Sequence, residues 1–209
     1  MSTIADNIGL VSQRIRAAAD AVQRDASSIH LLAVSKTKPA QAVREAYAAG
    51  LRDFGENYLQ EALGKQADLT DLPLSWHFIG PIQSNKTRAI AEHFAWVHSV
   101  DRLKIAQRLS EQRPADLPPL NICIQVNVSG EASKSGCTPA DLPALATAIS
   151  ALPRLKLRGL MAIPEPTEDR AEQDAAFATV RDLQASLNLP LDTLSMGMSH
   201  DLESAIAQG

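Results

Sequence analysis

The chain has 209 residues, 45% of them apolar and 4% aromatic, and a formal net charge of −4. The apolar fraction predicts a folded protein with a large core, and the length suits one α/β barrel, so we expect residues 1–209 to form a single domain. The negative charge and the few aromatic residues argue against a protein that binds nucleic acid through a basic face or a stacking platform.

Helical and extended segments alternate along the chain. Apolar residues three or four positions apart predict a first amphipathic helix over 4–24. Short apolar runs then predict strands over 29–34, 51–55, 75–80, 96–100, 120–128, 155–163 and 191–196. Helices are predicted after these strands, over 40–49, from 56, over 87–93, 101–111, 138–150 and 168–187, and from 199 to the end.

This alternation implies parallel strands joined by right-handed crossovers. A doubly wound open sheet would alternate in the same way. However, no predicted strand is followed by a Gly-x-Gly-x-x-Gly turn, and the number of strands is close to eight. We therefore expect an α/β fold of the TIM-type (β/α)8 barrel class, with the final strand absent from this chain.

Capping residues set the expected helix boundaries. Pro39 fits the first turn of the helix over 40–49, and Gly50 suits the position just after that helix. Asp101 and Thr138 are expected to cap the helices that follow the fourth and fifth strands, and Ser199 is expected to open the last helix.

The sequence shows no sign of secretion or of a membrane segment. Cys123 and Cys137 are too few for a disulfide framework, and no metal-ligand spacing surrounds them. The chain does not start with a signal-like segment, and no apolar run reaches the length of a membrane span. We expect a cytoplasmic protein with no membrane or nucleic-acid partner.

A lysine follows the first predicted strand, in Ser35-Lys36-Thr37-Lys38. In a parallel α/β fold, ligands bind at the carboxyl ends of the strands. A lysine amine held against apolar walls has a lowered pKa and becomes a nucleophile toward carbonyl groups. The residues alone leave a second interpretation open, in which Lys36 begins an ordinary solvated loop.

The segment 195–199 lies between a predicted strand and a predicted helix. Backbone N–H groups at such a place would suit a phosphate, although Ser199 could equally serve only as a helix cap. An amine able to form an imine and a phosphate cradle at the same end of the barrel would together suit pyridoxal phosphate.

Four further side chains are weaker candidates. His77 and His98 lie inside predicted strands, where a hydrogen-bonded core histidine is the simpler interpretation and a ring-stacking or proton-carrying role the alternative. Met161 lies where its sulfur could pack against a ring, or could equally belong to the core. Lys134 is a second amine, in a loop of small and polar residues.

Five motifs in collinear order carry a family resemblance. They are Ala33-Val34-Ser35-Lys36-Thr37-Lys38-Pro39, Phe54-Gly55-Glu56-Asn57-Tyr58, His77-Phe78-Ile79-Gly80 with Gln83-Ser84-Asn85-Lys86, Gly159-Leu160-Met161-Ala162, and Leu194-Ser195-Met196-Gly197-Met198-Ser199. With these motifs the chain resembles the pyridoxal phosphate homeostasis proteins, from its first helix to Gly209. The barrel of that family is similar to the N-terminal domain of alanine racemase.

The resemblance implies roles for individual residues. Lys36 would carry pyridoxal phosphate as an imine, with Asn57 and Met161 beside the cofactor. Ser199 would help to hold the phosphate, together with Met196 and Gly197 of the same segment. Lys134, in Ser133-Lys134-Ser135-Gly136, also matches the family pattern, and we expect it to help pass the cofactor on.

Two departures from the family pattern concern the phosphate site. Family members continue beyond the Ala-Ile-Ala-x-Gly helix into a final strand with an Arg-Ile-Gly-Thr segment, which faces the pyridine nitrogen and holds the phosphate. This sequence stops at Gly209. His200 also stands where an acidic residue is usual. The resemblance therefore implies a barrel with an open edge and an incomplete phosphate cradle.

The resemblance implies a protein that binds and delivers pyridoxal phosphate without a catalytic reaction of its own, with apo forms of enzymes that use this cofactor as partners. One alternative is a racemase- or decarboxylase-like enzyme. Racemases of this fold bring a second acid–base tyrosine from a separate β domain, and the tyrosines here are Tyr47, on a helix, and Tyr58, early in the next one. The other alternative is a protein–protein scaffold with a vestigial site.

Overall fold

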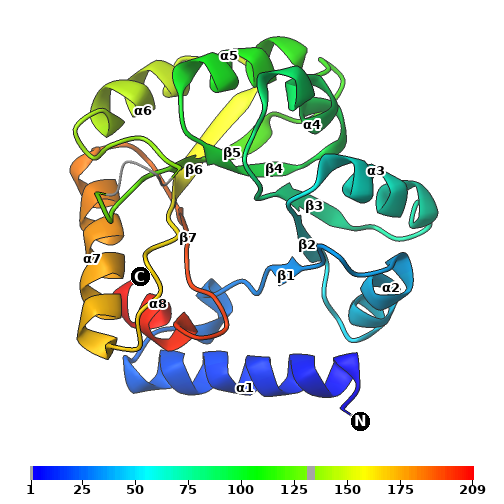
Figure 1. The fold of residues 1–209 in the computed structure, drawn as a ribbon, viewed down its shortest axis with the longest axis vertical. Coiled ribbons are helices and arrows are strands. Elements are labelled where there is room, and N and C mark those ends of the chain that lie inside the picture. Colours follow the sequence, from blue (N-terminus) through cyan, green and yellow to red (C-terminus); the bar gives the residue numbers. More distant parts are fainter. Residues whose placement is uncertain (1, 131–134) are drawn as a thin grey trace.

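The structure is a computed structural model that describes residues 2–130 and 135–209. Helices and strands alternate around a ring (Figure 1). The strands are β1 (Ala33–Val34), β2 (Asp53–Glu56), β3 (Ser75–Phe78), β4 (Trp96–Val100), β5 (Leu120–Gln125), β6 (Leu155–Met161) and β7 (Thr193–Ser195). The α-helices are α1 (Ile4–Ala21), α2 (Ala40–Ala48), α3 (Leu59–Asp68), α4 (Thr87–His93), α5 (Leu103–Gln112), α6 (Leu142–Ser150), α7 (Arg170–Ser186) and α8 (Leu202–Gln208).

The sheet confirms the expected barrel class. Its strands run in the order β1 to β7, and every neighbouring pair is parallel. Helices cover the outside of the sheet, as in a (β/α)8 barrel that lacks its last strand (Figure 1). None of the described helices has the length and apolar character needed to cross a membrane.

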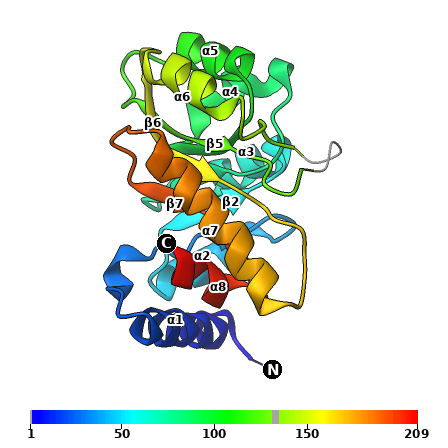
Figure 2. The same ribbon diagram turned by 90° about the vertical axis from the view of Figure 1, so that its left-hand side faces the viewer.

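The first and last helices lie together in the part of the ring between β7 and β1. Both views place α1 and α8 side by side, far from α4, α5 and α6 (Figures 1 and 2). The guanidinium of Arg14 in α1 binds the carboxylate of Glu203 in α8, with Nε 2.7 Å from Oε1. Arg24 adds a bond of 3.2 Å to the carbonyl oxygen of Ile206. The two helices together cover the side of the barrel where β1 and β7 are not paired.

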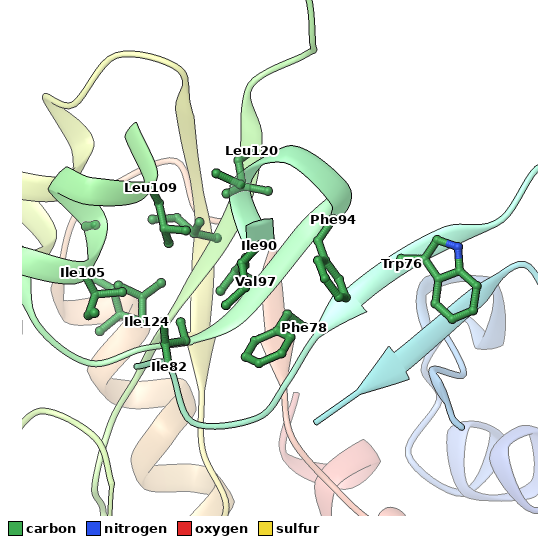
Figure 3. Packing of buried hydrophobic residues seen from close by; sticks show 14 of the residues in the cluster. Trp76, Phe78, Ile82, Ile90, Phe94, Val97, Ile105, Leu109, Leu120 and Ile124 are labelled. Carbon is green, nitrogen blue, oxygen red and sulfur yellow. The ribbon is translucent and has the colours of Figure 1, made fainter. Parts of the chain in front are cut away.

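The helices over β3 to β5 enclose the outer core of the protein. Phe78 of β3 and the ring of Phe94, just after α4, meet edge to face with centroids 5.3 Å apart. Figure 3 shows them beside Ile90, Val97, Ile105, Leu109, Leu120 and Ile124, which are fully buried. Each such side chain contributes about 1.5–3 kcal/mol through burial. This layer fixes β3, β4 and β5, whose carboxyl ends form part of the candidate site.

The barrel interior is more polar than the outer core. Strand residues alternate in direction, so Trp76 and Phe78 face the helices while His77 between them faces inward. The His77 ring stacks on Trp96 of β4, with centroids 5.4 Å apart. The guanidinium carbon of Arg158 lies over the Trp96 ring, 4.5 Å from its centroid. Nε of the same arginine binds the Asp192 carboxylate at 2.8 Å.

Several predicted boundaries are wrong, both at the edge of the sheet and at helix starts. The strand predicted over 29–34 is reduced to the two residues of β1, because an edge strand has a ladder partner on one side only. Asp101 does not cap α5, since its carboxylate binds the side chain of Arg102. The Thr138 hydroxyl donates to the Asp141 carboxylate and accepts from its backbone N–H, in a turn that precedes the helix. α6 therefore begins at Leu142 and not at Thr138.

The start of the last helix is also displaced. α8 begins at Leu202, after Asp201, and not at Ser199. The carboxylate of Asp201 accepts a hydrogen bond from the backbone N–H of Met198, which closes a loop ahead of the helix. Ser199 therefore lies inside this loop. By contrast, Gly50 has a φ of +107° directly after α2, as a residue following a helix end requires.

Candidate functional site

Most of the predicted site residues lie at one end of the barrel. Lys36 follows β1, Asn57 follows β2, Met161 ends β6, and the segment 196–199 follows β7. Because the strands are parallel, their carboxyl ends meet at the same end of the barrel. Lys134, the predicted second amine, lies outside the described residues.

Lys36 is exposed rather than enclosed. Val34, two residues before it, is 50% exposed, and the exposure of Lys36 agrees with the interpretation in which it begins a solvated loop. The lysine belongs to a tight turn in which the backbone N–H of Lys38 donates to the carbonyl oxygen of Ser35 at 3.1 Å. Thr37 in this turn has a φ of +62°, a region that non-glycine residues seldom adopt. The amine can therefore meet a ligand directly from solvent.

A buried charged cluster lies next to this turn. The Lys65 ammonium of α3 contacts the Glu56 carboxylate and the carbonyl oxygen of Ser35, each at 2.5 Å. The Ser35 hydroxyl also donates to Glu56, at 2.6 Å. Glu61 binds both the Lys65 ammonium and the backbone N–H of Thr37. The bond from Lys65 lowers the pKa of the Glu61 carboxyl.

The sequence reasoning missed Lys65 and gave Glu56 the wrong place. Glu56 was expected to open a helix, whereas it ends β2 and is fully buried. A signal for Lys65 was present: it follows Leu59 and Ala62 at a spacing of three on the buried stripe of α3. A lysine at such a position requires acceptors inside the protein.

Asn57 carries a polar atom that no neighbour satisfies. Its Oδ1 is buried and has no hydrogen-bond partner within residues 2–130 and 135–209. The backbone of Asn57 is held close to Gly80, where an added Cβ would lie 2.3 Å from the Asn57 carbonyl oxygen. The hydroxyl of Ser99 in turn donates to the carbonyl oxygen of Gly80 at 2.5 Å. A buried amide oxygen of this kind marks a place for a ligand donor or a water.

The segment after β7 contains a glycine in the left-handed region of the backbone. Gly197 has a φ of +87°, and a Cβ there would lie 2.7 Å from the Cβ of Ala205. Met161, 5% exposed, pairs in register with Ser195, so its side chain belongs to the same end of the barrel. Met196 is half-buried. Ser199 is exposed, and its carbonyl oxygen accepts a bond from Arg14 at 2.9 Å.

A chain of hydrogen bonds crosses the barrel interior and ends at Ser195. The Asp53 carboxylate lies 3.1 Å from His77 Nε2, and His77 Nδ1 lies 2.9 Å from His98 Nε2. His98 Nδ1 then lies 2.6 Å from the Ser195 hydroxyl. The hydrogen bond from His77 lowers the pKa of Asp53, and burial lowers the pKa of His98 to about 3.

These contacts assign the tautomers of both rings. A carboxylate only accepts hydrogen bonds, so His77 carries its hydrogen on Nε2. His77 Nδ1 then accepts from Nε2–H of His98, which leaves His98 Nδ1 to accept from the Ser195 hydroxyl. His77 is thus a hydrogen-bonded interior histidine, as the simpler interpretation predicted. Its ring nitrogens are already engaged.

Neither cysteine nor any described cluster offers other chemistry. Burial raises the pKa of the Cys123 thiol to about 12 and that of Cys137 to about 11, so both thiols are unreactive near neutrality. In the part of the chain that the structure describes, no group of three or more metal-ligating side chains could hold a metal ion.

Comparisons with known proteins show the family and the fold. Residues 11–208 match the family described as the alanine racemase N-terminal domain. A curated protein of Pseudomonas aeruginosa, named pyridoxal phosphate homeostasis protein, is 78% identical over 209 residues, which are 100% of this chain and 91% of that protein. A Vibrio cholerae protein of the same name is 55% identical over 216 residues, covering 100% of this chain and 92% of that protein.

A solved structure with bound cofactor is also similar. The structure of PipY from Synechococcus elongatus with PLP bound superposes with a TM-score of 0.83 at 44% identity. The match covers 95% of this chain and 94% of PipY.

Proposed function

Because this chain belongs to the pyridoxal phosphate homeostasis protein family, we propose that it binds pyridoxal phosphate through Lys36 and keeps or delivers that cofactor without a reaction of its own. The observation that carries this proposal is the PLP-bound structure of PipY, which matches almost the whole chain. The exposed lysine at the carboxyl ends of the strands supports it.

The residues present fit this cofactor. An unprotonated lysine nitrogen that attacks the aldehyde of pyridoxal phosphate forms a C=N bond, and the carbonyl oxygen leaves as water. Lys36 would supply the nitrogen, and the unsatisfied Oδ1 of Asn57 would accept a hydrogen bond. Met161 would lie beside the ring. The open backbone at Gly197, with Met196 and Ser199, would hold the phosphate.

The surroundings of Lys36 favour a carrier over an enzyme. A racemase needs a second acid–base group held on the far side of the reacting carbon. Tyr58 is 57% exposed, and the ring of Tyr47 lies under the Arg52 guanidinium at 3.9 Å, on the outside of the barrel. Among the described residues, neither tyrosine therefore stands as an opposing acid–base group, whereas an amine that is open to solvent can exchange its aldehyde.

A labelling experiment tests the binding site. The protein is mixed with pyridoxal phosphate, scanned for the visible absorbance of an imine, reduced with borohydride and mapped by peptide mass. We expect the reduced adduct on Lys36 and its loss in Lys36→Ala. Lys38→Ala is the matched control, because Lys38 is an exposed lysine of the same turn. An adduct elsewhere, or none, overturns the proposal. Racemisation of free amino acids by the loaded protein would favour the enzyme alternative.

We also propose that the loaded protein passes the cofactor to apo-enzymes, with Lys134 taking part. The test follows recovery of activity in an apo-enzyme that uses pyridoxal phosphate, with free cofactor at equal concentration as the reference. Lys134→Ala should slow the recovery without changing the Lys36 adduct. Equal rates for the variant and the wild type would contradict the role of Lys134. Recovery no different from that with free cofactor would contradict delivery itself.

A further inference from the structure

The backbone on both sides of Lys36 is fastened to one cluster of charged residues. On the amino side, the carbonyl oxygen of Ser35 accepts a hydrogen bond from Lys65 at 2.5 Å. The hydroxyl of the same serine donates to Glu56 at 2.6 Å. On the carboxyl side, the backbone N–H of Thr37 donates to Glu61 at 2.6 Å. Lys36 is thus the residue between two anchored neighbours.

Lys65 holds the cluster together. Its ammonium has three hydrogens and three acceptors: the Ser35 carbonyl oxygen, Glu56 Oε1, and Glu61 Oε1 at 2.7 Å. The Lys65 side chain is only 6% exposed. A buried ammonium is stable only when it is paired and hydrogen-bonded. Every bond that Lys65 makes therefore contributes to fixing the turn.

The turn needs such support because its conformation is unfavourable. Thr37 is β-branched and has a φ of +62°, a strained conformation that persists only when the surrounding structure enforces it. The bond from its backbone N–H to Glu61 supplies that constraint. One carboxylate oxygen of the cluster, Glu56 Oε2, is buried and has no hydrogen-bond partner among the described residues.

We propose that Lys65, acting with Glu56 and Glu61, is a positioning residue that fixes the turn 35–37 so that the Lys36 amine meets the cofactor in one orientation. This inference rests on the proposed function, in which Lys36 carries pyridoxal phosphate. Lys65 itself is not a ligand-binding lysine, because its three hydrogens are engaged inside the protein.

Two variants test the proposal at different levels. Glu61→Gln weakens the bond to Thr37 at a carboxylate that is 31% exposed, so the fold should persist. Lys65→Met combined with Glu56→Gln removes the two buried charges together and leaves uncharged side chains in their place. Glu45→Gln on the exposed face of α2 is the matched control.

Release of the cofactor is followed by loss of the imine absorbance after a trapping amine is added. We expect release to be about tenfold faster in Glu61→Gln, the factor that corresponds to losing one charge-assisted hydrogen bond. The control should release at the wild-type rate. A merely structural cluster would lower the melting temperature and leave the release rate of the folded protein unchanged, and that result would overturn the proposal.

Hydrogen exchange of the Thr37 amide gives a readout without cofactor. The proposal expects this amide to be protected in the wild type and to exchange at least about tenfold faster in Glu61→Gln. Unchanged exchange would overturn the positioning role even if Lys36 is labelled. No Lys36 adduct in the wild type would overturn the proposed function, and the positioning role with it.

Discussion

Stability between pH 7 and pH 5 should depend on His98. Its side chain is 5% exposed, and burial together with the nearby His77 lowers its pKa from 6.5 to about 3. The folded protein therefore keeps His98 neutral over a range in which the unfolded chain takes up a proton. The contribution of neutral His98 to the free energy of unfolding is present above pH 6.5 and is lost progressively as the pH falls toward 3.

The size of the loss follows from the two pKa values. The His98 pKa is about 3 in the folded protein and 6.5 in the unfolded chain. Integrating the difference in proton uptake from pH 7 to pH 5 gives a decrease of about 2 kcal/mol in the free energy of unfolding. The groups that face the ring are His77, Trp96 and Ser195, with Asp53 behind His77. Asp53 has a lowered pKa with an ordinary value of 3.8, so it titrates below this window.

The substitution His98→Gln removes the titrating group and keeps its bonds. A glutamine amide can donate to His77 Nδ1 and accept from the Ser195 hydroxyl. Urea unfolding, followed by far-UV circular dichroism at pH 7 and pH 5, gives the free energy of unfolding at each pH. The variant should lose about 2 kcal/mol less than the wild type between the two pH values. His93→Gln, on the exposed face of α4, is the matched control.

The comparison concerns the difference between the two pH values, so a general loss of stability in the variant does not affect it. If His98→Gln loses as much stability on acidification as the wild type, the buried neutral histidine is not the source of acid sensitivity. The assignment of His98 as a neutral link between His77 and Ser195 would then be refuted.

Three substitutions probe other close contacts. Gly80→Ala should lower the affinity for the cofactor by about tenfold or more, because its Cβ would lie 2.3 Å from the Asn57 carbonyl oxygen. The far-UV circular dichroism should change little. A binding titration measures the affinity, and an unchanged value would contradict the prediction. Gly159→Ala should lower the free energy of unfolding in urea by about 2–4 kcal/mol, since its Cβ would lie 1.7 Å from the carbonyl oxygen of Thr193 in β7. Arg113→Met removes hydrogen bonds to three carbonyl oxygens and should cost about 3 kcal/mol in the same assay, whereas the exposed Arg88→Met should cost less than about 0.5 kcal/mol.

The order of elements was predictable because the hydrophobic pattern alone sets it. α4 and β4 have the predicted bounds of residues 87–93 and 96–100, although the two residues between them, Phe94 and Ala95, are apolar. β1 is shorter than its apolar run because a ladder needs a neighbour, and the sequence does not state where the sheet ends. The predicted helix starts at Asp101 and Thr138 are wrong for different reasons. The Asp101 carboxylate binds the side chain of Arg102, whereas the Thr138 hydroxyl accepts the backbone N–H of Asp141 in a turn that precedes α6.

The candidate site was predictable in position but not in its surroundings. The place of Lys36 follows from one local rule, that a residue after a parallel strand lies at the ligand-binding end. The exposure of Lys36 depends on which segments distant in the sequence pack next to it, and a local sequence pattern does not predict this. Lys65 is 30 residues from Ser35, and the bond between His98 and Ser195 spans 97 residues. Such pairs arise only when the fold brings distant segments of the chain together.

The consecutive strand order has a consequence for how the protein assembles. Each strand pairs with the strand that precedes it in the chain, so during synthesis a new βα unit can add to an edge that is already formed. α1 is the exception, because the contact between Arg14 and Glu203 joins residues 189 apart. The contacts of α1 with α8 can form only once the last helix is present, whereas its contacts with α2 can form earlier. Contacts of such long separation form late in folding and open early in local unfolding, so the α1–α8 pair is where this barrel should first come apart.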